Sequence, residues 1–178
     1  MVAYRRMRRK GAIYFFTLVL ADRRSQWLIT HVGSVAKALR ETRAKHQFEN
    51  IAMVVLPEHI HMMWELVPVD KDFPKLIRCF KSQFTKELIR KKVLLTKDNR
   101  GRYNVWQPRY WEHVIGSDDD FEKHFNYIHY NPVKHGHVNR VVDWPYSSFH
   151  RYVKAGVLMQ DWAGAVGGVR EDICFGEI

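Results

Sequence analysis

The fold is decided by the stretch Leu56-Pro57-Glu58-His59-Ile60-His61-Met62-Met63-Trp64-Glu65-Leu66-Val67. From Ile60 to Val67 its residues alternate: Ile60, Met62, Trp64 and Leu66 would face a core, and His61, Met63 and Glu65 the other side. Successive side chains of a β-strand point to opposite faces of the sheet, so this alternation predicts a strand. His59 would share the face of His61. The strand thus presents two imidazoles side by side.

The segments around this strand predict a regular order of elements. Further strands are predicted where β-branched and aromatic residues gather, over 13–20, 48–56 and 111–115. Helices are predicted over 32–46, 73–91 and 118–130; the second has Leu76, Phe80, Phe84 and Leu88 at four-residue spacing. The third helix has Ser117 as its N-cap and three aspartates in its first turn.

This order predicts an α+β fold: a ferredoxin-like split βαβ with an antiparallel sheet, helices on one face and an extra C-terminal helix. A length of 178 residues favours a single domain. Residues 1–140 would form the principal domain. Residues 141–178 would form an irregular, aromatic-rich tail that packs on it or contacts its binding partner.

The charge balance indicates a polyanionic partner. The net charge is +10, and residues 1–50 and 75–109 carry net charges of +8 and +9. Cations at such density bind phosphates by releasing counterions. Two distant cysteines indicate a reducing compartment, and no apolar run reaches the ~20 residues of a membrane helix. The basic N-terminus before Ala12 superficially resembles a secretory signal, but the run after it favours a buried strand.

His59 and His61 can bind one metal ion together, since neutral imidazoles two residues apart on a strand face the same way. Composition alone supplies a second pair, His135 and His137, around Gly136. The spacing by itself therefore leaves two surface histidines as an equal alternative.

The predicted helix over 118–130 adds a nucleophile. Tyr127 and Asn131 are four residues apart, so they share one helical face. The alternative is a half-buried tyrosine, with Asn131 ending the helix before Pro132. Two imidazoles and an amide oxygen suit Mg²⁺ or Mn²⁺, and a metal beside a tyrosine favours attack on a phosphodiester. Tyr130 is the competing tyrosine, but it lies about 100° round the helix from Asn131.

Four blocks resemble the single-tyrosine HUH endonucleases, and within them the transposases associated with repetitive extragenic palindromes (REP) of bacteria. They are Leu56 to His61, Trp106 to His113, Tyr127 to Gly136 and Asp143 to His150. The resemblance implies a metal-dependent endonuclease and strand transferase that cleaves single-stranded REP-type hairpins through a covalent 5′-phosphotyrosine. Tyr127 would be the nucleophile, and His59, His61 and Asn131 would bind the metal. Relatives often have Gln in place of Asn131.

The same resemblance implies a bacterial, cytoplasmic, nucleoid-associated protein, a monomer or homodimer, with hairpin DNA as partner and neither membrane nor small-molecule cofactor. Candidate DNA contacts come from the basic and aromatic segments: Arg5, Arg6, Arg8, Arg9, Lys10, Lys81, Arg109, Lys134, Trp144 and His150.

Three other functions compete with this interpretation. A nucleic-acid-binding module on the same sheet would bind without metal or cleavage. A family member that has lost its chemistry would act as a DNA-binding regulator. A zinc hydrolase would use His59, His61 and a third histidine, and would form no protein–DNA adduct.

Overall fold

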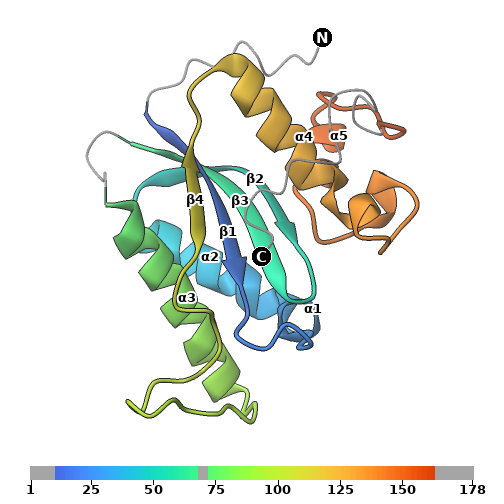
Figure 1. Cartoon of the computed structure of the whole chain (residues 1–178). Helices are drawn as coiled ribbons and strands as arrows, with labels where there is room; N and C mark the ends of the chain where they lie inside the picture. The colour runs from blue at the N-terminus through green and yellow to red at the C-terminus, as the bar shows by residue number, and fades with distance from the viewer. Residues whose placement is uncertain (1–10, 68–71, 163–178) are drawn as a thin grey trace.

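A computed structural model describes residues 11–67 and 72–162, and in this part of the chain a four-stranded antiparallel sheet forms the centre (Figure 1). The strands are β1 (Ile13–Val19), β2 (Phe48–Val55), β3 (His59–Leu66) and β4 (Trp111–Val114), in the spatial order β2-β3-β1-β4. All three neighbouring pairs run antiparallel. This is the strand order of the predicted ferredoxin-like α+β fold, which is confirmed.

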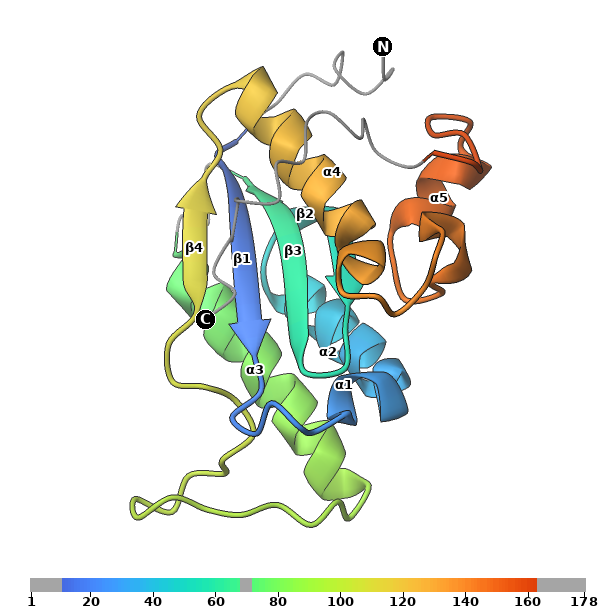
Figure 2. The same ribbon diagram turned by 45° about the vertical axis from the view of Figure 1, so that its right-hand side comes forward.

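Helices cover the sheet as two separate layers. Helices α2 (Val32–Lys45) and α3 (Phe73–Arg90) pack together on one face, as predicted. The extra helix α4 (Asp118–Lys134) crosses the other face, and α5 (Phe149–Lys154) lies beyond it (Figure 2). A short helix that the pattern did not predict, α1 (Trp27–Thr30), precedes α2. None of the helices in the described ranges is long and apolar enough to span a bilayer.

The alternation along β3 sorts its side chains between these two layers. Ile60, Met62 and Trp64 enter the core shared with α2 and α3. Met63 joins the second core, which is built with α4 and α5. His59 and His61 are therefore directed to the α4 side, as the period-two pattern predicted.

Helix α4 begins as predicted and ends later than predicted. The hydroxyl of Ser117 accepts a hydrogen bond from the Asp120 amide at 3.1 Å, which caps the first turn. The helix was expected to stop at Tyr130, but it continues through Pro132 to Lys134. Pro132 lacks the amide hydrogen bond to the residue four positions earlier and crowds that carbonyl, yet the helix continues past it. The end is set by Gly136, whose φ of +68° permits a Schellman turn with the bonds Gly136 N to Val133 O and His137 N to Pro132 O.

The segment after Asn139 is more regular than the predicted irregular tail. It contains a 3₁₀ turn (Val141–Asp143) and helix α5. Hydrogen bonds fasten it to β2: the Ser148 amide donates to the Met53 carbonyl at 2.8 Å, and the Ser148 hydroxyl accepts from the Met53 amide at 2.9 Å. Its aromatic side chains serve the second core, which explains why a segment without helical periodicity is ordered.

Candidate active site

The two histidines of β3 lie together on the α4 side of the sheet. His59 is the first residue of β3, directly after the turn that joins β2 to β3, and His61 follows on the same face. Their ring centroids are 4.7 Å apart, and both side chains are buried. The strand thus places two imidazoles where one ion can contact both, which the spacing predicted.

Each imidazole is held from behind through its Nδ1 atom. The carboxylate of Glu58 lies 2.9 Å from His59 Nδ1. The hydroxyl of Thr17, directly opposite His61 on β1, lies 2.9 Å from His61 Nδ1. Contacts of this kind fix the ring orientation and the tautomer of metal-binding histidines. With Nδ1 of each ring engaged, a metal ion would bind at Nε2.

The charge of Glu58 supports this arrangement. Burial raises the pKa of Glu58, but the hydrogen bond with His59 and the charges of His59 and His135 outweigh burial and hold that pKa below its ordinary value. The carboxylate is therefore ionised at neutral pH. An ionised acceptor at Nδ1 makes the imidazole a stronger ligand at Nε2.

Helix α4 brings Tyr127 against this histidine pair. The Tyr127 ring lies 5.2 Å from the His61 ring, edge to face. The Lys134 ammonium lies 4.9 Å from the centre of the Tyr127 ring. Asn131 follows one turn after Tyr127, on the same helical face, and is fully buried. The helical face that Tyr127 shares with Asn131 is buried, and only 2% of Tyr127 is exposed.

The residues present fit a divalent metal ion. His59 Nε2 is buried and has no hydrogen-bond partner among the described residues. A buried polar atom left in this way costs free energy unless a ligand satisfies it. Two imidazole nitrogens and an amide oxygen form a mixed nitrogen and oxygen donor set with room for phosphate oxygens. His59, His61 and Asn131 are therefore the residues that would hold the ion.

The predicted DNA contacts occupy different surroundings. Arg109 is exposed, whereas the Lys81 ammonium donates to the Gln107 carbonyl at 2.9 Å, and burial lowers the pKa of Lys81 to about 8. The Trp144 indole donates to the Val55 carbonyl at 3.0 Å, and the Trp144 carbonyl lies 2.8 Å from His150 Nε2. Arg5, Arg6, Arg8, Arg9 and Lys10 lie outside the described residues.

Three residues beside the histidine pair were not predicted from the sequence as site residues. Strand pairing places Thr17 opposite His61, and Glu58 directly precedes His59 and contacts its ring. His135 lies with its ring 5.4 Å from His59. The sequence attributes the pair His135 and His137 to composition, because it straddles Gly136 outside any predicted strand. Once α4 extends to Lys134, its terminal turn brings His135 to the site.

Comparison with known proteins establishes the family. The sequence profile of the family described as Transposase IS200 like matches residues 10–131. The chain belongs to the IS200-like transposase family. Among its members, the REP-associated tyrosine transposase of Escherichia coli K12 is 44% identical over 166 residues, which is 93% of each chain. A Haemophilus influenzae relative is also 44% identical, over 164 residues, covering 90% of this chain and 93% of its own. The resemblance to REP-associated tyrosine transposases is thereby confirmed.

Two solved structures extend the likeness to three dimensions. The structure of a REP-associated tyrosine transposase bound to a REP hairpin has a TM-score of 0.81 and 43% sequence identity, and it covers all of this chain and 98% of its own. A protein of Deinococcus radiodurans R1 has a TM-score of 0.50 at 17% identity, over 63% of this chain and 85% of its own. The second likeness shows the fold alone.

Proposed function

We propose that this transposase-family protein is a metal-dependent endonuclease and strand transferase that acts on single-stranded, REP-type hairpin DNA through a covalent 5′-phosphotyrosine on Tyr127. The observation that carries the proposal is the contact of the Tyr127 ring with His61, beside a buried His59 Nε2 without a partner among the described residues. The relative solved with a REP hairpin supports the substrate class. The alternative is a non-catalytic, nucleic-acid-binding regulator on the same fold.

The proposed chemistry assigns one role to each side chain. Tyr127 Oη attacks the phosphorus and forms a bond to it, while the bond from phosphorus to the 3′ oxygen breaks and that oxygen leaves as a 3′-hydroxyl. The Mg²⁺ or Mn²⁺ ion held by His59, His61 and Asn131 would offset negative charge on the phosphate. The Lys134 ammonium lies close to the Tyr127 ring and places positive charge beside the nucleophile. The phosphotyrosine bond keeps the energy needed to rejoin strands.

Burial of the nucleophile sets a condition on DNA entry. Tyr127 is 2% exposed, and a phosphodiester must approach its hydroxyl oxygen for an in-line displacement. Binding of DNA must therefore be coupled to exposure of the Tyr127 face of α4. The segment that follows α4 lies beside the histidine pair. In this segment His135 lies against His59, and His137 stacks on Trp144 at 5.2 Å. A DNA strand that displaces the rings of His135, His137 and Trp144 would reach the active site, and its bases would stack on those rings.

A second surface suits the stem or flank of the DNA. A groove of about 660 Å³ lies between α3 and the segment before β4, and it is lined by Arg78, Lys86, Arg102, Tyr103 and Trp106. Cationic side chains would contact phosphates, and exposed aromatic rings would stack on bases. Lys81 lines the same groove, with its ammonium 5.2 Å from the Tyr110 ring. We place the DNA contacts of Lys81 and Arg109 on this side, and those of Lys134, Trp144 and His150 near the active site.

The adduct assay tests the nucleophile. We expect Tyr127→Phe to abolish the covalent protein–DNA adduct formed with single-stranded hairpin DNA and Mn²⁺, because phenylalanine has no attacking oxygen. Hairpin affinity should stay within about twofold. The adduct is measured by denaturing gel electrophoresis, with EDTA as the metal-free comparison. Tyr130→Phe is the matched control and should keep the adduct. An adduct that persists in Tyr127→Phe, or one that forms equally in EDTA, contradicts the mechanism.

A further inference from the structure

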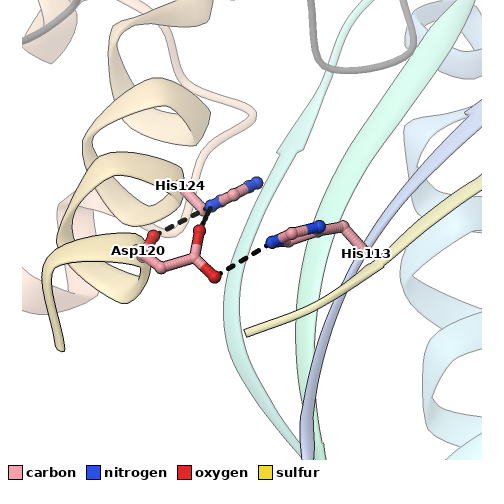
Figure 3. Close-up of side chains that lie close together, drawn as sticks. All are labelled: His113, Asp120 and His124. Carbon is pink, nitrogen blue, oxygen red and sulfur yellow. Dashed lines mark hydrogen bonds and ion pairs between the residues drawn. The ribbon is translucent and has the colours of Figure 1, made fainter. Parts of the chain in front are cut away.

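A second cluster of metal-ligating side chains lies on the same side of the sheet. It joins His113 on β4 to Asp120 and His124 in the first two turns of α4 (Figure 3). One nitrogen of each histidine and a carboxylate oxygen of Asp120 all lie within 4.8 Å of one another. Within residues 11–67 and 72–162, this is the only group of three histidine, cysteine, aspartate or glutamate side chains that meets this spacing.

The carboxylate of Asp120 lies between the two imidazoles. Its Oδ2 atom is 2.9 Å from His113 Nε2, and its Oδ1 atom is 2.9 Å from His124 Nδ1. The two imidazole rings stack at 4.7 Å with an angle of 12° between their planes. The side chains direct their polar atoms toward one another, as Figure 3 shows. The backbone adds two contacts: the Gly116 amide donates to Asp120 Oδ2 at 2.9 Å, and His124 Nδ1 donates to the Asp120 carbonyl at 2.8 Å.

The charge states in this cluster suit a cation. Burial raises the pKa of Asp120, but hydrogen bonds from the Gly116 amide and from His113 outweigh burial and keep the carboxyl ionised at neutral pH. Burial lowers the pKa of His124 more than its hydrogen bonds to Asp120 raise it, so that imidazole is neutral at pH 7. A carboxylate beside a neutral imidazole is ready to ligate, since ligands must be free of the proton that a metal replaces.

We propose that His113, Asp120 and His124 form a second metal site, which binds a transition-metal ion of the Zn²⁺ class. Two imidazole nitrogens and one carboxylate oxygen form a donor set that Zn²⁺ accepts, with a fourth position left for water. The ion takes the place of the protons that now join the imidazoles to Asp120. The half-exposed His113 side chain, 39% accessible on an edge strand, gives the ion a path from solvent.

The position of this site indicates what the ion does. The Phe15 ring separates the two clusters, with its centroid 4.8 Å from His124 and 5.5 Å from His61. The same ring lies 6.2 Å from Tyr127, which follows His124 by three residues on α4. An ion bound here ties the edge strand β4 to the start of α4. It would therefore fix the start of the helix that carries Tyr127.

Zinc binding tests the proposal in the full chain with His59→Ala, a substitution that removes one proposed ligand of the first site. We expect metal-free His59→Ala to bind one Zn²⁺ per chain with micromolar or tighter affinity in isothermal titration calorimetry, and to melt at a higher temperature with Zn²⁺. His59→Ala/His113→Ala should bind Zn²⁺ at least 100-fold more weakly. His59→Ala/His31→Ala is the matched control, since His31 lies between α1 and α2 in the opposite layer, and it should bind as His59→Ala does.

A spectroscopic measurement covers the case in which a double variant folds poorly. In ¹⁵N-histidine-labelled His59→Ala, Zn²⁺ should shift the imidazole nitrogens of His113 and His124. Shifts confined to His61 and His135, no Zn²⁺ binding by His59→Ala, or equal affinity in the His113 double variant would each overturn the second site. None of these results depends on DNA cleavage, so they leave the proposed function to the Tyr127 experiment.

Discussion

The two histidine clusters beneath α4 differ in what holds their imidazoles. In the first, Glu58 and Thr17 engage the Nδ1 atoms from behind, so that a metal ion would bind at the Nε2 atoms. In the second, the single carboxylate of Asp120 bridges both imidazoles and uses the atoms that a metal would need. The first ion would keep positions for the substrate, whereas the second would join β4 to α4 and bind water in its fourth position.

The largest contrast is expected from removing one histidine of each cluster. His59→Ala should lower the rate of adduct formation in Mn²⁺ roughly 1000-fold, since loss of metal-assisted charge stabilisation costs several kcal/mol. His113→Ala should lower that rate less than about tenfold, because the second cluster acts on the position of α4. Single-turnover assays on the same hairpin DNA give both rates. Equal losses in the two variants would remove the functional distinction between the clusters.

A smaller effect is expected behind the first cluster. Glu58→Gln keeps the shape of the side chain but removes the charge that supports His59 Nδ1. Loss of such an outer contact weakens metal affinity by about 10- to 100-fold. A Mn²⁺ titration of adduct formation measures the change, with Tyr127 left in place. Asp120→Asn is the control from the other cluster. If it weakens the Mn²⁺ dependence as much as Glu58→Gln does, the supporting role of Glu58 is wrong.

The sequence predicted the first cluster far better than the second, and strand periodicity explains why. Two residues of one strand, such as His59 and His61, share a face whatever the remainder of the chain does. The helical spacing of Tyr127 and Asn131 is equally local. His113 meets Asp120 only because β4 pairs with β1 at the edge of the sheet and the chain then reverses into α4. That contact depends on tertiary structure, and no motif signals it.

The end of α4 and the presence of α5 were also missed, because neither follows from the hydrophobic pattern of the sequence alone. The sequence predicts that α4 ends before Pro132, but α4 continues past this proline despite the missing amide hydrogen bond, and the Schellman turn at Gly136 ends the helix. Helix α5 was not predicted because packing against the second core, rather than an amphipathic period, stabilises it. The core strands and α3 were predicted well, since burial and local periodicity agree there.

The second buried imidazole on α4, His129, affects the stability of the fold and takes no part in the proposed chemistry. It contacts neither cluster: its ring packs 4.3 Å from Phe125, and its Nε2 lies 2.8 Å from the Ser148 hydroxyl. Burial lowers the pKa of His129 to about 3. The unfolded chain, with a histidine pKa near ~6.5, therefore binds a proton that the folded chain excludes as the pH falls. The stability contributed by neutral His129 is complete above pH ~6.5 and is lost progressively toward pH ~3.

The variant His129→Phe should flatten this acid limb. It removes up to ~1.4 kcal/mol per pH unit from the slope of the unfolding free energy between about pH 6 and pH 4. At pH 7.5 it should cost about 1 kcal/mol through the lost contact with Ser148. Urea unfolding at a series of pH values measures both effects. Adduct formation at pH 7.5 should remain within about twofold of the parent, because His129 supports the packing of α5 rather than either metal cluster. If the slope of the unfolding free energy against pH does not change, another buried group is responsible for the acid sensitivity.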